Sequence, residues 1–442
     1  MSWLLDAELI DGGMIPAFGV LTTALVVLVA ARGRRRPRRL ASGAAIGIAL
    51  GVALVLFCDV SRIFDVELPP YSAVWVAVGL GLAGLGVAAL LQASWGRGSV
   101  AALLVLTSLV LGALGVNREF GITHTLASIL GVQALAPVAL PARTPTPPGP
   151  GPVYSSWTPP PGMPAKGEVG ALSGDTRIPS PGYAPRDAAI YLPPAALVAH
   201  PPKLPLLVFM MGQPGSPDPT TLAAALDAFA AAHSGLAPIA IVADQLTAPQ
   251  LDPACHDSTT YGAVSSYFNV SIPAYARAHL NVIADPAYWA IGGYSNGGSC
   301  AVLWGSQHPE IWGNILDVSG NEYPGSGNDA QTIAKVFAGD GAAFAAAKPT
   351  AVMAAHPGEY AGHTAVFTAG TLDTTYGPGQ RANAAAAGAA GFTTVFDAVP
   401  GATHVGAALT DGLALGVPAL AAPLGLAPAQ RPPAATASER TP

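Results

Sequence analysis

The most telling segment of the chain is Trp289–Gly297, which reads WAIGGYSNG. An apolar, strand-like run leads directly into a Gly-x-Ser-x-Gly motif, and this context predicts a nucleophile elbow, a sharp strand-to-helix turn that exposes a serine hydroxyl. Glycines flank the serine because larger side chains would collide in so tight a turn. Ser295 is therefore the candidate nucleophile. Chance is the alternative, since a chain with 51 glycines can produce one such motif without any catalytic role.

The first part of the chain is more apolar than a soluble protein tolerates. Apolar residues make up 51% of the whole chain and charged residues only 10%. Four charge-free stretches approach the ~20 residues that a helix needs to cross a bilayer; they cover residues 15–31, 40–58, 72–94 and 99–116. We therefore expect four transmembrane helices. A signal peptide is a poor alternative for the first, because the residues before it are acidic rather than basic.

Charges in the connecting loops predict how these helices are oriented. The loop 32–39 carries six arginines, and short arginine-rich loops stay in the cytoplasm. We therefore expect a multi-pass protein of the cell membrane, whose N-terminus and all residues after 116 are extracytoplasmic. Binding of nucleic acid by these arginines is disfavoured, because they lie between two membrane spans. The spans contain no charged residue that would indicate an ion path, so their expected role is that of an anchor.

Composition also predicts the domain boundaries. Residues 1–140 form the transmembrane domain, and 141–164 form a linker in which ten of 24 residues are proline. Proline favours extended polyproline geometry, so this linker is expected to be a spacer that holds the next domain off the bilayer. Residues 165–426 are enough for one substantial core. The low-complexity tail, 427–442, is expected to be disordered.

Within residues 165–426, apolar strand-like runs alternate with helical segments. The strand-like runs are 188–192, 204–211, 239–243, 289–292, 315–319, 365–369 and 394–399. This alternation predicts a mostly parallel sheet flanked by helices. Ligands of such sheets bind beyond the carboxyl ends of the strands, and Ser295 directly follows one of these ends.

A nucleophilic serine needs a base, and α/β-hydrolases place their residues in the chain order Ser, Asp or Glu, His. His404, the last histidine of the chain, follows the final strand-like run and could return to Ser295; the alternative is an ordinary solvated loop histidine. Asp373 follows the preceding run and would accept the imidazole N–H, stabilising the imidazolium that forms during catalysis. The acids that remain as alternatives are Asp317, Glu322 and Asp397.

Acyl transfer also needs donors for the developing oxyanion. The typical pair is the backbone N–H of the residue after the nucleophile and a second N–H from the loop after an earlier strand. Asn296 provides the first. In the loop 211–215, which reads MGQPG, Pro214 has no N–H, so Gln213 is the expected second donor. The same loop would also make a good simple turn.

Several segments together resemble one known family. They are Tyr191–Pro194, Gly212–Gly215, Cys255–Asp257 followed by Tyr261, Trp289–Ala301, His308–Glu310 and Ser319–Gly320. This combination is similar to the esterase group of the α/β-hydrolases that includes esterase D and the mycolyltransferases, and most of all to its membrane-anchored actinobacterial members. The resemblance spans most of residues 165–426 and implies an α/β-hydrolase fold. Asn296 and Val405 depart from the family pattern, so the substrate does not follow from it.

Three cysteines fit an extracytoplasmic location. Cys58 lies in a predicted membrane helix, whereas Cys255 and Cys300 lie in the outer domain, where oxidising conditions permit a disulfide. The family resemblance suggests that these two pair; two buried free thiols are the alternative. A metal site at Cys255 and His256 is disfavoured, because no second ligand pair of the usual spacing is present. No metal or other cofactor is implied.

The sequence thus predicts a membrane-anchored, extracytoplasmic serine esterase or acyltransferase that works through a Ser-His-Asp triad and an acyl-enzyme. Tethering near the bilayer favours a lipid or cell-envelope ester as substrate, because it raises the local concentration of both partners. Candidates are an acylated glycolipid, an aminoacylated lipid and a mycolate-type ester. The alternative is a catalytically silent envelope scaffold with a hydrolase fold. A transporter is disfavoured by the uncharged spans.

Overall fold

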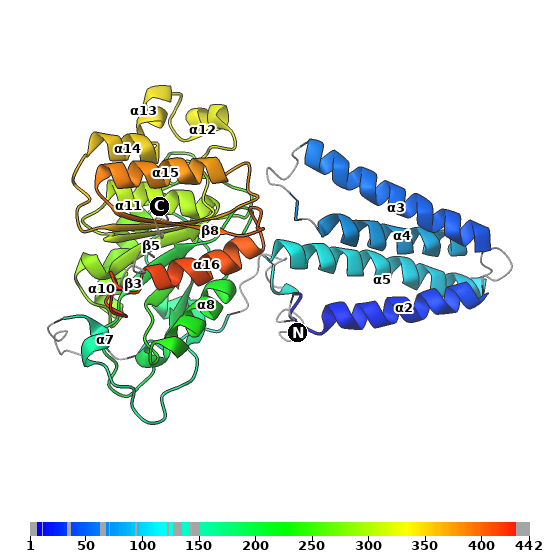
Figure 1. Cartoon of the computed structure of the whole chain (residues 1–442), viewed down its shortest axis with the longest axis horizontal. Coiled ribbons are helices and arrows are strands. Elements are labelled where there is room, and N and C mark those ends of the chain that lie inside the picture. Colours follow the sequence, from blue (N-terminus) through cyan, green and yellow to red (C-terminus); the bar gives the residue numbers. More distant parts are fainter. Residues whose placement is uncertain are drawn as a thin grey trace, which may run out of the picture.

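A computed structural model of the chain describes most of its residues. The described ranges are 7–10, 12–32, 37–61, 68–69, 71–92, 95–121, 123–126, 135–141, 143 and 151–429. They form two parts that lie side by side, a helix bundle of the first 121 residues and a sheet domain of residues 151–429 (Figure 1).

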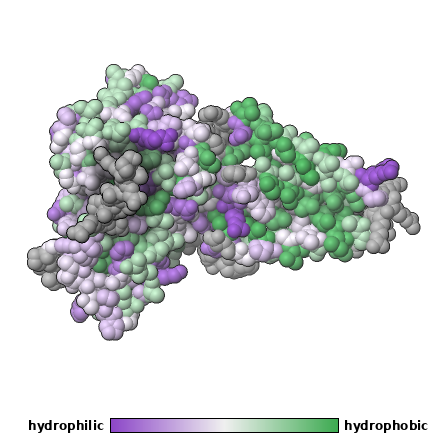
Figure 2. All heavy atoms as spheres, in the orientation of Figure 1, coloured by the Kyte–Doolittle hydropathy of each residue, from purple (hydrophilic) through white to green (hydrophobic). Residues whose placement is uncertain are grey.

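Within the described ranges, four helices of the bundle are long and apolar enough to cross a membrane. They are α2 (Met14–Arg32), α3 (Pro37–Val60), α4 (Ser72–Leu90) and α5 (Trp95–Phe120). Helix α4 ends four residues before the predicted boundary, and α5 extends beyond the predicted span of 99–116 at both ends. The charge-free runs stop at Arg97 and Arg118, whereas backbone hydrogen bonding does not depend on side-chain charge. Figure 2 shows that hydrophobic residues gather over this bundle and hydrophilic ones over the sheet domain.

Glycines bring the helices of the bundle into close contact. A Cβ atom on Gly47 would collide with the carbonyl oxygen of Leu80, and one on Gly84 would collide with that of Gly43. These glycines therefore allow α3 and α4 to approach backbone to backbone. Small residues serve this purpose in membrane helices, where packing replaces the hydrophobic effect as the driving force for association.

Residues 168–399 contain one sheet of eight strands in the order β1-β2-β4-β3-β5-β6-β7-β8. The strands are β1 (Glu168–Leu172), β2 (Ala188–Leu192), β3 (Leu206–Met210), β4 (Ile239–Val242), β5 (Trp289–Tyr294), β6 (Asn314–Val318), β7 (Thr364–Gly370) and β8 (Thr393–Val399). Strands β3 to β8 pair in parallel, whereas β2 is antiparallel to both β1 and β4. The mostly parallel sheet confirms the sequence prediction and fits the α/β-hydrolase fold. Strand β1 was not predicted, because its short sequence EVGAL lacks a long apolar run.

Helices cover both faces of the sheet (Figure 1). On one face lie α8 (Thr220–Ala232) and α16 (Ala407–Ala419), and on the other lie α11 (Asn296–Gln307), α14 (Pro349–Ala355) and α15 (Gly377–Ala390). Shorter helices are α7 (Val153–Ser156), α9 (Val264–Ser266), α10 (Ile272–His279), α12 (Asp329–Lys335) and α13 (Gly341–Ala346). Phe209, Trp289 and Trp304 are fully buried in the core between these layers. This covering leaves the carboxyl ends of the strands as the natural place for a site.

The end of α5 contacts the sheet domain directly. The Gly406 N–H donates to the Phe120 carbonyl at 3.0 Å. Farther along the chain, Val153 and Trp157 pack against the core, and the Trp157 indole N–H donates to the Ser234 carbonyl at 2.8 Å. At these two residues the predicted linker 141–164 therefore packs on the sheet domain, and its role as a spacer stays a prediction. The apolar side chains of Val153 and Trp157 gain free energy by this burial.

The predicted disordered tail begins where the core ends. Leu424 and Leu426 are buried, and the Ala427 N–H donates to the Ala421 carbonyl at 3.3 Å. Residues 430–442 lie outside the described residues, so disorder of the tail stays a prediction for them.

Candidate active site

Ser295 stands in a strained turn between β5 and α11. Its φ of 56° and ψ of −119° lie in a region that residues with a side chain rarely adopt. A Cβ on Gly293 would collide with the backbone of Gly297, and one on Gly297 would collide with the Met210 carbonyl oxygen. The two glycines of the motif are thus required by the local packing. The turn has the geometry of a nucleophile elbow.

The structure brings the three predicted triad residues together. The Ser295 Oγ lies 2.8 Å from the His404 Nε2, and the His404 Nδ1 lies 2.9 Å from the Asp373 Oδ2. All three residues are buried. An ionised carboxylate can only accept, so Nδ1 carries the hydrogen and Nε2 is the acceptor that faces the serine hydroxyl. This is the tautomer that a general base acting on Ser295 requires.

Several groups hold Asp373 and His404 in place. Burial raises the pKa of Asp373, but the hydrogen bond and charge of His404 and two backbone N–H groups outweigh it and lower the pKa. One of these donors is the Tyr376 N–H, 2.8 Å from Oδ1. The imidazole also packs against the rings of Tyr376 and Tyr294, at centroid distances of 4.4 Å and 5.9 Å. Asp373 therefore stays ionised beside a firmly oriented imidazole.

The three alternative acids occupy other positions. Asp317 is completely buried beneath the elbow, where its Oδ2 accepts from the Gln380 Nε2 at 2.8 Å. Burial raises the pKa of Asp317 to about 7. Asp397 lies within β8 opposite Thr368, and Glu322 is exposed. The carboxylate that His404 contacts is that of Asp373.

Both residues predicted to hold an oxyanion line the same cavity as Ser295. Gly212, next to Gln213, is so near that a Cβ on it would lie 3.2 Å from the Cβ of Ser295. Asn296 is the first residue of α11, and N–H groups in the first turn have no carbonyl partner within their helix. The helix dipole also favours negative charge at this end. The assignment of an oxyanion hole to Gln213 and Asn296 stays a prediction.

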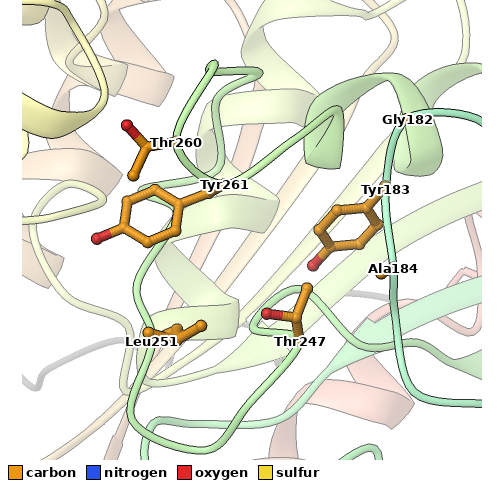
Figure 3. A pocket seen from close by; sticks show the side chains of 7 residues that line it. All are labelled: Gly182, Tyr183, Ala184, Thr247, Leu251, Thr260 and Tyr261. Atoms are coloured by element: carbon orange, nitrogen blue, oxygen red, sulfur yellow. The ribbon is translucent and has the colours of Figure 1, made fainter.

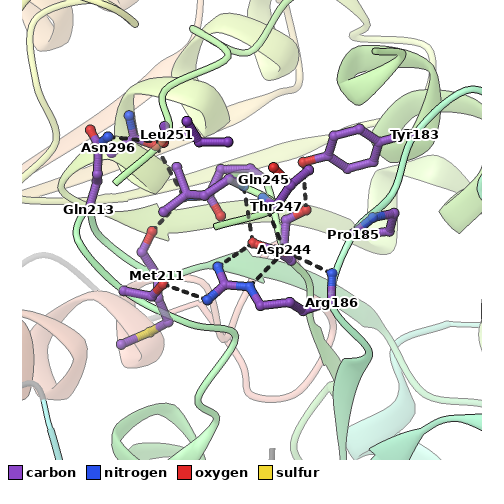
Figure 4. A network of polar contacts seen from close by, with 12 residues as sticks. Tyr183, Pro185, Arg186, Met211, Gln213, Asp244, Gln245, Thr247, Leu251 and Asn296 are labelled. Carbon is purple, nitrogen blue, oxygen red and sulfur yellow. Dashed lines mark hydrogen bonds and ion pairs between the residues drawn. The ribbon is translucent and has the colours of Figure 1, made fainter. Parts of the chain in front are cut away.

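A polar network that the sequence analysis missed supports this loop (Figure 4). The Gln245 side-chain amide donates to the Met211 carbonyl at 2.7 Å and to the Asn296 Oδ1 at 3.1 Å. The Gln213 side chain in turn donates to the Leu251 carbonyl at 2.9 Å. Gln245 thereby joins the loop after β3 to the elbow, the two segments that carry the predicted oxyanion donors.

An ion pair continues the network on its other side (Figure 4). The Arg186 guanidinium donates to both carboxylate oxygens of Asp244, at 2.9 Å and 2.7 Å, and also to the Gly215 carbonyl at 2.9 Å. Asp244 is almost fully buried. One signal was available in the sequence, because Asp244 and Gln245 directly follow a strand-like run at the carboxyl edge of the sheet.

The cavity at Ser295 has a volume of about 1060 Å³, and both parts of the chain line it. From the sheet domain come Ser295, His404, Tyr376 and Asp252, and from the bundle come residues of α3, α4 and α5. Burial raises the pKa of Asp252, although a backbone N–H partly offsets this effect. A second hollow of about 470 Å³, seen in Figure 3, lies beside Tyr183 and Tyr261 and does not include Ser295.

A disulfide joins Cys255, in the loop after β4, to Cys300 in α11. It therefore ties the helix that follows the nucleophile to a loop near the site, as the family resemblance suggested. The Trp304 indole N–H reinforces the contact by donating to the Cys255 carbonyl at 3.0 Å. Among the residues that the structure describes, no three His, Cys, Asp or Glu side chains converge as metal ligands would.

One curated protein that the chain resembles is an uncharacterized protein of Corynebacterium glutamicum. The two share 35% identity over 249 residues, which cover 53% of this chain and 58% of that protein. The chain thus spans little more than half the length of this relative. No protein-family model matches the chain.

Among solved structures, the chain is similar to a ferulic acid esterase, with 14% identity and a TM-score of 0.47 over 59% of this chain and 99% of that chain. An S-formylglutathione hydrolase from Agrobacterium tumefaciens gives 16% identity and a TM-score of 0.46 over 58% and 96%. The fluorophosphonate-binding serine hydrolase F of Staphylococcus aureus gives 13% identity and 0.45 over 58% and 98%. At such scores these likenesses decide neither activity nor substrate for this chain.

Proposed function

We propose that this chain is a membrane-anchored serine esterase or acyltransferase whose catalytic residues are Ser295, His404 and Asp373. The observation that carries the proposal is the continuous hydrogen-bonded chain from the Ser295 hydroxyl through His404 to the Asp373 carboxylate. It begins at a strained serine and opens into a cavity. A structural serine would need neither the strained backbone nor the cavity.

The geometry supports a two-step acyl transfer. The Ser295 Oγ attacks the ester carbonyl carbon while the His404 Nε2 takes the hydroxyl proton, and Asp373 stabilises the resulting imidazolium. The N–H groups of Gln213 and Asn296 stabilise the oxyanion, which collapses as the leaving alcohol takes the proton from His404. Water or another hydroxyl group then attacks the acyl-enzyme, with His404 as the base, and Ser295 is regenerated.

The proposed location is the extracytoplasmic side of the cell membrane, with α2 to α5 as spans. Their length and apolarity support this, together with the arginine-rich loop 32–39. The proposed substrate is a lipid or cell-envelope ester, because the bundle would hold the site at the surface where such esters occur. No cofactor takes part in the proposed reaction.

A fluorophosphonate probe tests this proposal. We expect the full-length protein to be labelled and Ser295→Ala to be silent, while Ser155→Ala, at an exposed serine outside the cavity, is labelled like the wild type. Asp373→Asn should lower the rate constant for ester hydrolysis by about 10⁴-fold, because the imidazole would lose its required tautomer. A wild type that resists the probe, or labelling that survives in Ser295→Ala, would instead support a catalytically silent scaffold.

A further inference from the structure

The cavity at Ser295 extends along one face of α5. The α5 residues that line it include Leu109, Gly112, Ala113, Val116 and Phe120. They recur every three or four positions, which places them on one side of a helix. Most of them are apolar. One wall of the cavity is therefore a hydrocarbon-like stripe that runs down the bundle, away from the sheet domain.

A matching stripe on the neighbouring helix α4 forms a second wall, with Trp75, Val76, Gly79 and Leu80. The two helices touch at Gly79, where a Cβ would lie only 3.0 Å from the Gly112 Cα. Leu54 of α3 completes the lining. We call the part of the cavity that these three helices line the hydrocarbon slot.

Trp75 has a fixed position at the end of the slot nearest Ser295. Its indole N–H donates to the Glu119 Oε1 at 3.3 Å, and its ring packs so closely on α5 that a Cβ on Gly115 would collide with it. Glu119 in turn lies in the segment of α5 that contacts Gly406, two residues after His404. These contacts fix the position of the slot relative to the active site.

The length of the slot matches one leaflet of a bilayer. From Leu109 to Phe120 the helix advances by about 16 Å, at ~1.5 Å per residue. The hydrocarbon core of a bilayer is ~30 Å thick, so a lipid chain in one leaflet occupies roughly 15 Å. Ser295 and His404 lie at one end of this length, and Leu109 lies at the other.

The far end of the slot opens toward the surface of the bundle. The side chains of Leu54 and Leu109 are 49% and 45% exposed, and Ala113 between the two ends is also exposed. On a bundle that spans a membrane, this surface faces lipid. A hydrocarbon chain could therefore enter sideways, without first passing through water.

We propose that the hydrocarbon slot binds one chain of a membrane lipid ester and places the ester carbonyl at Ser295. This inference rests on the proposed esterase function and identifies its substrate class. The bundle then forms part of the substrate site, in addition to anchoring the protein. Because lipid tails are as apolar as the slot, binding gains little transfer free energy, and the benefit lies in orienting the ester.

A narrowed slot tests the proposal in the full-length protein reconstituted in lipid nanodiscs. Hydrolysis of p-nitrophenyl laurate is compared with that of p-nitrophenyl acetate, whose acyl group is too short to occupy the slot. We expect Ala113→Phe to lower the laurate-to-acetate ratio of kcat/KM by at least roughly tenfold. Ala102→Phe is the matched control, since Ala102 is exposed eleven residues earlier on the same face, beyond the slot. It should keep the wild-type ratio.

A second measurement uses the wild type alone, so it does not depend on the folding of a variant. An alkyl fluorophosphonate with a diazirine at the chain end is attached to Ser295 and irradiated. We expect crosslinks to the far end of the slot, at Gly79 or Leu80 in α4 or at Leu109 or Ala113 in α5. Crosslinks confined to the sheet domain, or an unchanged laurate-to-acetate ratio in Ala113→Phe, would overturn the proposed role of the slot and leave the esterase proposal standing. No reaction with either ester or probe would overturn the esterase proposal, and the slot with it.

Discussion

Two buried carboxylates at the ends of neighbouring strands carry opposite pKa shifts. Asp317, in β6, loses hydration and gains only a few hydrogen bonds, so its pKa rises to about 7. Asp373, after β7, is also buried, but the hydrogen bonds and charge of His404 and two backbone N–H groups lower its pKa. The sequence favoured Asp373 over Asp317 as the partner of His404 but left Asp317 as an alternative. The opposite pKa shifts depend on which groups surround each carboxylate in space, and the sequence does not show these groups.

The raised pKa of Asp317 predicts a particular dependence of stability on pH. The unfolded chain releases this proton near pH 3.9 and the folded protein near pH 7, so the contribution of Asp317 to stability is greatest below about pH 4. It is lost progressively as the pH rises from about 4 to about 7. Asn does not titrate. We therefore expect the melting temperature of Asp317→Asn, relative to that of the wild type, to be higher at pH 8 than at pH 5.

The control for this prediction is Thr368→Val on the neighbouring strand β7. Thr368 is fully buried and has no titratable group, so the effect of this substitution on the melting temperature should be the same at pH 5 and pH 8. Thermal unfolding is measured in one detergent at both pH values. Equal effects of Asp317→Asn at the two pH values would contradict the raised pKa of Asp317 in the folded protein.

At the scale of elements, the site depends on how three segments are joined. The elbow between β5 and α11, the loop after β3 and the loop after β4 meet at Ser295, and Gln245 bridges the first two. The disulfide between Cys255 and Cys300 joins the third to α11. The strand ends that carry these segments were visible in the sequence as apolar runs. Their joining was not, because hydrogen bonds between distant segments leave no periodic pattern.

The disulfide makes a prediction at this scale. It closes a loop with a sequence separation of 45 residues, which corresponds to about 4 kcal/mol of stabilisation in the chain-entropy model. We expect the double variant Cys255→Ser, Cys300→Ser to unfold at a clearly lower temperature than the wild type. Reducing agent should destabilise the wild type and leave the double variant unchanged. The Cys58→Ser variant, which keeps the disulfide, should respond to reducing agent like the wild type.

At the scale of the whole molecule, the bundle and the sheet domain share a cavity. The contact of Phe120 with Gly406 fixes the end of α5 beside the loop of His404 (Figure 1). This arrangement gives the bundle a part in the site that the sequence did not reveal, since each apolar run by itself predicts only a span. The four long apolar helices were predictable because length and hydrophobicity are properties of the chain.

The orientation of the whole molecule can be tested with cysteines introduced into a Cys58→Ser background. Val270 is 65% exposed on the sheet domain, and Arg38 is exposed in the first turn of α3. A maleimide that cannot cross membranes should label Val270→Cys in intact cells and Arg38→Cys only after permeabilisation, because arginine-rich loops stay in the cytoplasm. The reverse pattern would place the site on the cytoplasmic side.

The mostly parallel sheet, the four apolar helices and the candidate nucleophile could be predicted from the amino-acid sequence, because hydrophobic periodicity, hydrophobic length and tight-turn glycines are local properties. Only the folded chain shows which acid contacts His404, how Gln245 and Arg186 hold the loop at Gln213, and that α4 and α5 line the cavity of Ser295. These depend on contacts between residues far apart in the chain. Such contacts form only when the whole chain packs.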